Sequence, residues 1–236
     1  PRLSKLVSER SFPDRWIMSR LNHTVELVNN ELEAYRFDRA SLALYQFIWH
    51  EYCDWYLELI KPVLQGQETE EARATRQTLV DTLETIMRLL HPFMPFITEE
   101  IWQALPHDRD SVMVKSYPVP DASWTAPDME ERFALLDQTV SLLRTARVLL
   151  NYSPAQPIQF AIAHDNPAHR PQVEALHPHI VHLGRGTIER EPNRPTVKRL
   201  RMAREGLTVA VTVADDVDVQ KALDRLVKQQ DEQAKE

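Results

Sequence analysis

Two prolines that lie three residues apart, Pro92 and Pro95, constrain this chain more than any other feature of its sequence. The residue before a proline is pushed out of the helical region, and proline has no N–H to donate within a helix. A helix that reaches this point should therefore end near His91. A second helix can begin at Pro95, because the fixed backbone angle of proline suits the first helical turn. The stretch predicts a sharp corner between two helices and implies no catalytic group.

Apolar residues recur at helical spacing on both sides of this corner. We expect them to face the core, with Leu83 at the centre of a bundle. The upstream set is Leu79, Leu83, Ile86 and Leu90, and the downstream set is Ile97, Ile101 and Leu105. The bend itself should be packed by Phe93, Met94 and Phe96.

Two more helices are predicted before the corner. The first should begin at Pro13 or Asp14 and bury a face that consists of Ile17, Leu21, Val25, Val28 and Leu32. The second should be capped by Asp38 and end at about Lys61, before Pro62. It is apolar almost all round, which is typical of a helix in the middle of a bundle. Its polar stripe should pair with arginines of neighbouring helices, and consists of Glu51, Asp54, Glu58 and Lys61. These helices predict an antiparallel bundle.

The pattern changes after Leu105. Residues 108–126 are polar and contain prolines, with one short extended segment, SVMVKSY, at 111–117. A long helix is then predicted, with Phe133, Leu136, Val140, Leu143 and Val148 facing inward. Short strand-like segments follow it, which predicts a small α/β unit. The predicted fold is mainly α, in four parts: an irregular segment at 1–12, the bundle at 13–126, the α/β unit at 127–217 and a charged helix at 218–236.

Composition narrows the class of protein. The formal net charge of −7 argues against a protein that coats nucleic acid broadly, but it is compatible with a local RNA site. The single cysteine, Cys53, excludes an internal disulfide framework and fits a reducing cytoplasm. No apolar run suggests a membrane span, and no signal peptide is apparent. Because the chain begins at Pro1, we expect a piece of a longer protein.

A group of histidines raises the question of a metal site, since histidine is the commonest metal ligand. Its members are His164, His169, His177, His179 and His182. No cysteine accompanies them, and the spacing of the last three does not place them on one helical face. We therefore predict a surface loop and no metal site.

A basic run lies between residues 185 and 204 of an otherwise acidic chain. Seven arginines and lysines stand against Glu189 and Glu191, a local charge of +5. Such a run can be a solvated face, or it can contact phosphates. The sequence leaves both interpretations open.

Three segments resemble one family in their wording, order and spacing. HPFMPFITEEIW at 91–102 is similar to a signature of valyl-tRNA synthetases, the class I ligases that charge tRNA with valine. Two further segments, FDRASLALYQFIWHEYCDWYLELIKPVL at 37–64 and DRWIMSRLN at 14–22, resemble the same family. The Cys-Asp-Trp-Tyr wording at 53–56 is usually missing from the sister isoleucine and leucine enzymes. The resemblance covers roughly residues 13–105 and is weaker beyond them.

The resemblance implies that the bundle is an anticodon-binding domain that receives the anticodon stem-loop of tRNA(Val). The α/β unit would be a junction that leads into a coiled coil, whose first helix would be residues 218–236. The parent enzyme would attach L-valine to tRNA with ATP and magnesium. The His-x-Gly-His and Lys-Met-Ser-Lys-Ser motifs that hold ATP in that class are absent from this sequence. We therefore expect this part to have no catalytic residue and no cofactor, and to be inactive alone, monomeric and cytoplasmic, with no membrane or DNA partner.

Unstacked anticodon bases need aromatic or guanidinium planes, and the stem needs cations at its phosphates. The first candidates for tRNA binding are Arg15, Trp16 and Arg20, although Trp16 could equally belong to the core. The other candidates are Arg36, Lys61 and Arg88 in the bundle, Arg144 and Arg147 for the tRNA body, and Lys198, Arg199 and Arg201 in the junction. Two alternatives remain: the same domain of an isoleucyl- or leucyl-tRNA synthetase, or a helical protein-interaction scaffold that does not bind RNA.

Overall fold

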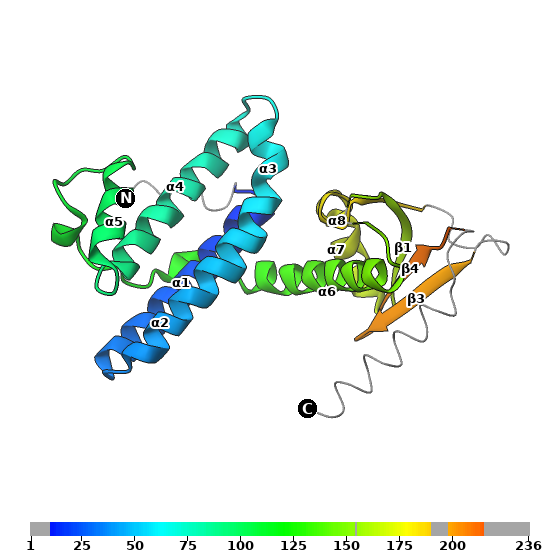
Figure 1. Cartoon of the computed structure of the whole chain (residues 1–236), viewed down its shortest axis with the longest axis horizontal. Helices are drawn as coiled ribbons and strands as arrows, with labels where there is room; N and C mark the ends of the chain where they lie inside the picture. The colour runs from blue at the N-terminus through cyan, green and yellow to red at the C-terminus, as the bar shows by residue number, and fades with distance from the viewer. Residues whose placement is uncertain (1–9, 154, 190–197, 215–236) are drawn as a thin grey trace. The chain divides into compact units, whose positions relative to one another are not determined.

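The computed structural model describes residues 10–153, 155–189 and 198–214 (Figure 1). The predicted charged helix at 218–236 and most of the segment at 1–12 lie outside these residues. The chain divides into two compact units between Glu131 and Arg132, inside helix α6 (Pro127–Leu149), whereas we predicted a boundary at residue 127. The structure confirms the predicted fold class, a mainly helical chain with a bundle and a small α/β part.

The first unit is the helical bundle. Its long helices are α1 (Phe12–Glu33), α2 (Phe37–Gln46), α3 (Leu57–Gln65) and α4 (Glu70–Leu90). The π-helix η2 (Phe47–Tyr56) joins α2 to α3 without a break, and α1 contacts α2, η2 and α4. Thr69 caps α4 by accepting a hydrogen bond from the backbone N–H of Ala72 at 3.1 Å. The predicted bundle is confirmed.

The proline corner is confirmed as well. Helix α4 ends at Leu90, and α5 (Pro95–Gln103) begins with proline in its first turn. Thr98 holds the bend together: its hydroxyl donates to the carbonyl of Met94 at 2.8 Å and lies 2.8 Å from Nδ1 of His91. The short helices η3 (Val112–Val114) and η4 (Ala122–Trp124) follow, so the segment that we predicted as extended at 111–117 is helical at its centre.

The buried face of α4 differs from the predicted one. Leu79, Leu83 and Leu90 are only half-buried, whereas Thr75, Thr78, Thr82 and Thr85 are buried beside Ile86 and Leu89. Two of these threonines satisfy their hydroxyls on carbonyls of the preceding turn, Thr78 on Ala74 and Thr85 on Asp81. With the hydroxyl satisfied, the methyl group can pack in the core. Periodicity of leucine alone therefore pointed to the wrong face.

The predicted stripe of α5 is also wrong. Ile97 of the predicted stripe is 48% exposed. Of the residues predicted to pack the bend, Phe96 is 90% exposed and Met94 is 51% exposed. The buried residues are Thr98 and Trp102, with Ile101 and Leu105 half-buried. Burial of the large indole of Trp102 fixes the rotation of this short helix and leaves Phe96 outside.

The second predicted helix is longer and less buried than expected. It begins at Phe37 rather than after Asp38, and it passes through Pro62 to Gln65. Pro62 lies within the last turn, so the one helical hydrogen bond that its missing N–H removes is close to the end of the helix. One face is buried, and it carries Leu44, Phe47, Tyr52, Tyr56, Leu59 and Ile60. The opposite face leaves Leu42, Tyr45 and Trp49 more than half exposed. The helix is therefore not in the middle of the described bundle.

The second unit is built on a four-stranded sheet in the order β2-β1-β4-β3. Strand β1 (Ile158–His164) pairs in parallel with β2 (Gly186–Ile188) and antiparallel with β4 (Leu207–Thr212). Strand β3 (Arg199–Arg204) pairs antiparallel with β4. A Cβ on Gly186 would lie 2.3 Å from the carbonyl oxygen of Ile158, so only glycine allows β2 to approach β1 this closely. These strands confirm the predicted α/β unit.

Helices η5 (Pro167–His169), α7 (Arg170–Ala175) and α8 (His177–Gly184) connect β1 to β2. The core contains alternate residues of β4, together with apolar residues of α6, α7 and α8. They are Leu207, Val209, Val211, Leu136, Val140, Leu143, Val173 and Ile180. Val148, which we predicted to face inward, is 70% exposed. Among the described residues, no helix is long and apolar enough to cross a membrane.

Candidate nucleic-acid interface

Arg20 is the most constrained of the predicted tRNA-binding residues. Its Nε and Nη2 donate to the two carboxylate oxygens of Glu51 at 2.8 and 2.9 Å, and its Nη1 donates to Glu130 at 3.2 Å. The hydrogen bond with Glu51 is the largest cause that raises the pKa of Arg20. The side chain is 28% exposed. Arg20 is therefore a permanent cation whose plane is fixed by two carboxylates, as we expected for the polar stripe that contains Glu51.

The neighbours of Arg20 on α1 differ in accessibility. Arg15 keeps 30% of its side chain exposed and lies 3.5 Å from Asp128. Trp16 is 1% exposed, so of the two fates that the sequence allowed, the structure selects the core. Trp16 does not offer a stacking surface to a base.

The buried carboxylate of Asp14 positions this end of α1, and the sequence analysis did not single it out. Asp14 is fully buried and accepts hydrogen bonds from the hydroxyls of Tyr56 at 2.7 Å, Thr75 at 2.8 Å and Ser11 at 2.8 Å. Burial, and then the charge of Asp14, raise the pKa of Tyr56. The network joins α1 to η2 and α4. In a sequence, an acidic residue in the first turn of a helix indicates only a favourable interaction with the helix dipole. The sequence does not show that distant hydroxyl groups will bind this carboxylate.

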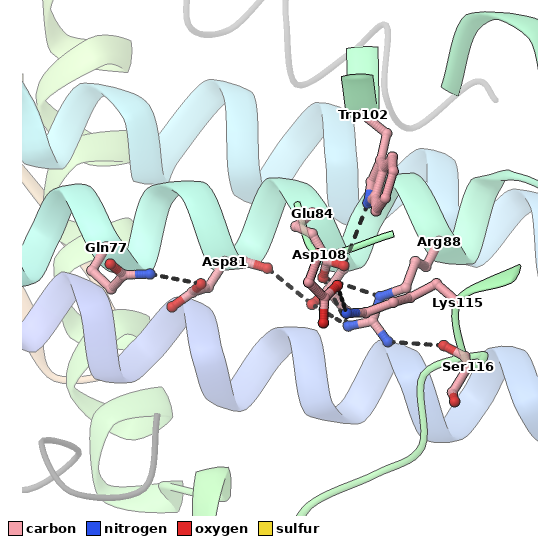
Figure 2. A network of polar contacts seen from close by, with 9 residues as sticks. Gln77, Asp81, Glu84, Arg88, Trp102, Asp108, Lys115 and Ser116 are labelled. Atoms are coloured by element: carbon pink, nitrogen blue, oxygen red, sulfur yellow. Dashed lines mark hydrogen bonds and ion pairs between the residues drawn. The ribbon is translucent and has the colours of Figure 1, made fainter. Parts of the chain in front are cut away.

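The other predicted residues of the bundle are all paired. Arg36 pairs with Glu31 and Lys61 with Glu58, and both cations remain nearly half exposed. Arg88 donates through Nε and Nη2 to Glu84 at 3.0 and 2.8 Å, and through Nη1 to the carbonyl of Ser116 at 3.0 Å (Figure 2). Its side chain is only 20% exposed.

Figure 2 shows that Arg88 belongs to a network that includes Trp102 and the segment after α5. Trp102 lies with Nε1 at 3.5 Å from Glu84, and Lys115 pairs with Asp108. The network holds the segment around residue 116 against α4. Its geometry supports a structural role for Arg88, with little guanidinium surface left for RNA.

Arg147, which we predicted as a candidate for the tRNA body, is buried. It is 8% exposed, and its guanidinium donates to four backbone carbonyls, those of Ser153, Gln156, Gly184 and Arg185, at 2.6 to 3.2 Å. Burial lowers the pKa of Arg147, and the charge of Arg185 contributes in the same direction. The guanidinium of Arg147 therefore holds together the backbone segments at 153–156 and 184–185, which leaves little of it for a phosphate. Arg144, three residues earlier, is exposed.

The junction candidates divide in the same way. Arg199, a predicted tRNA-binding candidate, pairs with Glu189 at 2.6 Å and keeps only 8% of its side chain exposed, which leaves little of its guanidinium for a phosphate. Thr212 also donates to Glu189. Lys198 and Arg201 are exposed. The basic residues at 190–197 lie outside the described residues, so the structure does not decide between the two interpretations of the basic run.

The five histidines do not form the surface loop that we predicted, because they lie on β1, η5 and α8. His164 and His169 form a pair, while His177, His179 and His182 lie on α8. Burial, and then the charges of Arg132 and His182, lower the pKa of His179. Within the ranges that the structure describes, no three residues among His, Cys, Asp and Glu are placed to hold a metal ion.

The glycines offer no phosphate cradle. A Cβ on Gly184 would lie 2.8 Å from Leu143, and a Cβ on Gly186 would meet Ile158, so both glycines are packed against neighbours. The residues present therefore do not fit the ATP phosphates that class I synthetases bind.

The described residues thus combine a helical bundle, which has paired arginines on its first helix, with a small α/β unit. The family described as the anticodon-binding domain of tRNA ligase matches residues 14–162. The chain belongs to this family.

Three relatives of the chain are valine–tRNA ligases. The valine–tRNA ligase of Legionella pneumophila (strain Lens) is 45% identical over 160 residues, which cover 65% of this chain and 17% of the relative. The valine–tRNA ligase of Oceanobacillus iheyensis is 40% identical over 161 residues, which cover 68% of this chain and 18% of the relative. That of Geobacillus stearothermophilus is 40% identical over 157 residues, with 66% and 18% covered. The chain spans less than a fifth of the length of these relatives.

Proposed function

We propose that this chain binds the anticodon stem-loop of tRNA(Val) and is the tRNA-binding part of a valine–tRNA ligase. The observation that carries the proposal is the family match, which spans the bundle and continues through α6 into β1. The names of the relatives support valine as the amino acid. The parent would join L-valine to tRNA with ATP and magnesium, and we propose a monomeric, cytoplasmic protein.

A chain with a net charge of −7 repels RNA at long range. A few local contacts with basic residues must therefore hold the RNA. Arg15 and Arg20 are the candidates for the anticodon. Three of the five N–H donors of Arg20 are occupied by Glu51 and Glu130, which fixes its orientation before RNA arrives. A fixed guanidinium plane offers a stacking surface at a low entropic cost.

Exposure ranks the remaining candidates for the phosphates. The structure leaves Arg36, Lys61, Arg144, Lys198 and Arg201 at least partly exposed. Contacts of this kind position an RNA without reading its bases. We propose these five residues as phosphate contacts, and we exclude Trp16, Arg147 and Arg199 on burial.

Binding of the chain to valine tRNA, measured at several salt concentrations, tests the proposal against both alternatives. We expect affinity to fall steeply with salt, since each phosphate contact releases counterions. Competition with isoleucine and leucine tRNAs distinguishes the valine enzyme from its sisters. Absence of salt-dependent binding to any of the three tRNAs would favour the protein-interaction scaffold.

The placement of the anticodon surface has its own test. Replacing Arg20 by alanine should weaken binding of cognate tRNA and reduce discrimination against a tRNA with a changed anticodon. The matched control is Arg73→Ala, at an exposed position of α4. Circular dichroism must show that both variants stay folded. An Arg20→Ala variant that binds both tRNAs as the parent chain does would remove Arg20 from the anticodon surface.

The missing phosphate motifs give a prediction about chemistry. We expect the chain alone to form no valyl-adenylate, because neither the sequence nor its packed glycines provide a site for ATP phosphates. Valine-dependent exchange of pyrophosphate with ATP measures this reaction. Exchange above that of a blank without protein would contradict the expectation.

A further inference from the structure

The surface around Arg20 carries more negative than positive charge. Two guanidinium groups, those of Arg15 and Arg20, face three carboxylates, those of Asp128, Glu51 and Glu130, at 2.8 to 3.5 Å. All five side chains are partly exposed, so a ligand can approach them from solvent. A surface with this charge repels a phosphate. If it contacts RNA, as the proposed function requires, it must contact a base.

The two carboxylates beside Arg20 hold it unequally. Glu51 accepts from both Nε and Nη2 of Arg20, at 2.8 and 2.9 Å, and its side chain is 23% exposed. Glu130 accepts only from Nη1, at 3.2 Å, and its side chain is 34% exposed. Ser19 donates to the other oxygen of Glu130 at 2.5 Å, which fixes this carboxylate in place. Glu51 therefore orients Arg20, whereas Glu130 is the more accessible of the two carboxylates.

Arg20 and Glu130 together present a donor beside an acceptor. An ionised carboxylate can accept about four hydrogen bonds, and the structure shows two on Glu130. A guanidinium has five N–H groups, and the structure shows three hydrogen bonds from Arg20. The carboxylate thus keeps the capacity to accept and the guanidinium keeps the capacity to donate, at groups that lie 3.2 Å apart.

Adenine and cytosine match this pattern, and guanine and uracil do not. On its Watson–Crick edge, each of the first two bases carries an amino group beside a ring nitrogen that accepts. The amino group can donate to Glu130, and the ring nitrogen can accept from Arg20. Guanine and uracil carry a carbonyl oxygen and a ring N–H in these positions, which reverses both directions. Because a carboxylate cannot donate, Glu130 rejects the carbonyl.

We propose that Arg20 and Glu130 read the Watson–Crick edge of an unstacked adenine or cytosine in the anticodon loop, and that Glu51 positions Arg20 for this contact. The inference rests on the proposed function and adds to it a residue, Glu130, that the sequence analysis did not single out. Every valine codon begins with guanine and uracil, so the anticodon of tRNA(Val) contains both adenine and cytosine. The pair selects a base that bears an amino group.

The test compares binding of tRNA(Val) with that of two altered tRNAs, in which a carbonyl replaces the amino group of one anticodon base. In one the cytosine becomes uracil, and in the other the adenine becomes hypoxanthine. We expect the unaltered chain to bind at least one altered tRNA about tenfold or more weakly, as a bidentate base contact provides. In Glu130→Gln the amide both donates and accepts, so the loss on that tRNA should shrink to about threefold or less.

Glu131→Gln, at the next position of α6, is the matched control. It removes the same charge from an exposed side chain and should keep the full loss. Circular dichroism must show that both variants stay folded. Should Glu130→Gln fail to fold, Glu130→Asp keeps the charge but draws the carboxylate back from the base, and it should shrink the loss as well.

A purely structural role for Glu130 gives a different result. Its substitution would then weaken binding of all three tRNAs alike and leave the loss on each altered tRNA unchanged. That result would overturn the inference, as would equal binding of the three tRNAs by the unaltered chain, and both would leave the proposed function standing. Absence of salt-dependent binding to any of the three tRNAs would remove the inference and the proposed function together.

Discussion

Asp14 in the bundle and Arg147 in the α/β unit are two buried charges that are satisfied in different ways. In the bundle, charged groups meet side chains: Asp14 takes three hydroxyl donors, and Arg20 takes two carboxylates. In the α/β unit, Arg147 meets four backbone carbonyls from two loops. In the bundle, the hydrogen bonds are shared among several side chains. In the α/β unit, all four carbonyls depend on the guanidinium of Arg147. A single substitution should therefore do more damage in the α/β unit.

Both strategies affect the search for an RNA site. A buried or paired arginine looks the same in sequence as an exposed one, and this chain uses several arginines as structural cations. Arg147 is 8% exposed as a whole residue, and the side chain of Arg199 is also 8% exposed. Arg201, on the same strand as Arg199, is exposed. Exposure therefore separates structural arginines from those that can contact phosphate.

The largest effect is expected for Arg147→Met. The substitution keeps roughly the aliphatic stem of the side chain but leaves four carbonyls without their donor, which should destabilise the α/β unit by roughly 4 kcal/mol. Hydrogen exchange of the β1 amides measures it. All five tryptophans lie at or before residue 124, so their fluorescence follows the bundle and should not change. Arg144→Met, three residues away and exposed, is the control. Equal losses in the two variants would contradict the role of Arg147.

A smaller effect is expected for Asp14→Ala in the bundle. The change leaves the hydroxyls of Tyr56 and Thr75 buried without their acceptor, which should destabilise the bundle by roughly 3 kcal/mol. Tyr56→Phe removes one hydrogen bond and should lose about 1 kcal/mol. Urea unfolding followed by tryptophan fluorescence measures both. If Tyr56→Phe proved as harmful as Asp14→Ala, the network would not be centred on the carboxylate.

A comparison of two leucines on α4 tests which face is buried. Leu89 is fully buried and Leu83 is half-buried. Leu89→Ala should therefore lose about 2 kcal/mol more than Leu83→Ala, since the loss follows buried volume. Urea unfolding of the two variants decides the order. A greater loss for Leu83→Ala would restore the face predicted from periodicity.

The sequence predicted the elements of the fold better than their buried faces. Pro92 and Pro95 act through local sterics, so the corner between α4 and α5 could be placed to the residue. The rotation of each helix depends on partners that are distant in the chain. On α4 the buried side carries four threonines, and on α5 Trp102 displaces the isoleucines. A hydrophobic pattern misses a threonine that satisfies its hydroxyl within its own helix.

The candidate site was less predictable for a related reason. The sequence predicted Arg20 as a candidate and Glu51 as the partner of an arginine on a neighbouring helix, and the structure shows that pair. It could not separate Arg147 from Arg144. Their difference arises from carbonyls at residues 153, 156, 184 and 185, which the fold brings to one guanidinium. The sequence did not predict the hydroxyl partners of Asp14 either, since two of them are distant in the chain.

The smallest effect separates the two arginines of β3 by function. Arg201→Ala should change stability by less than about 0.5 kcal/mol, since an exposed side chain is lost, yet it should flatten the salt dependence of tRNA binding by about one unit. Arg199→Ala should do the reverse: it leaves Glu189 without its cation and loses about 1–2 kcal/mol of stability, with the salt slope unchanged. Filter binding over a salt series, together with hydrogen exchange of β3, measures both properties. A salt slope that changed only in Arg199→Ala would mean that RNA displaces Glu189, and that burial is a poor guide to which arginines meet phosphate.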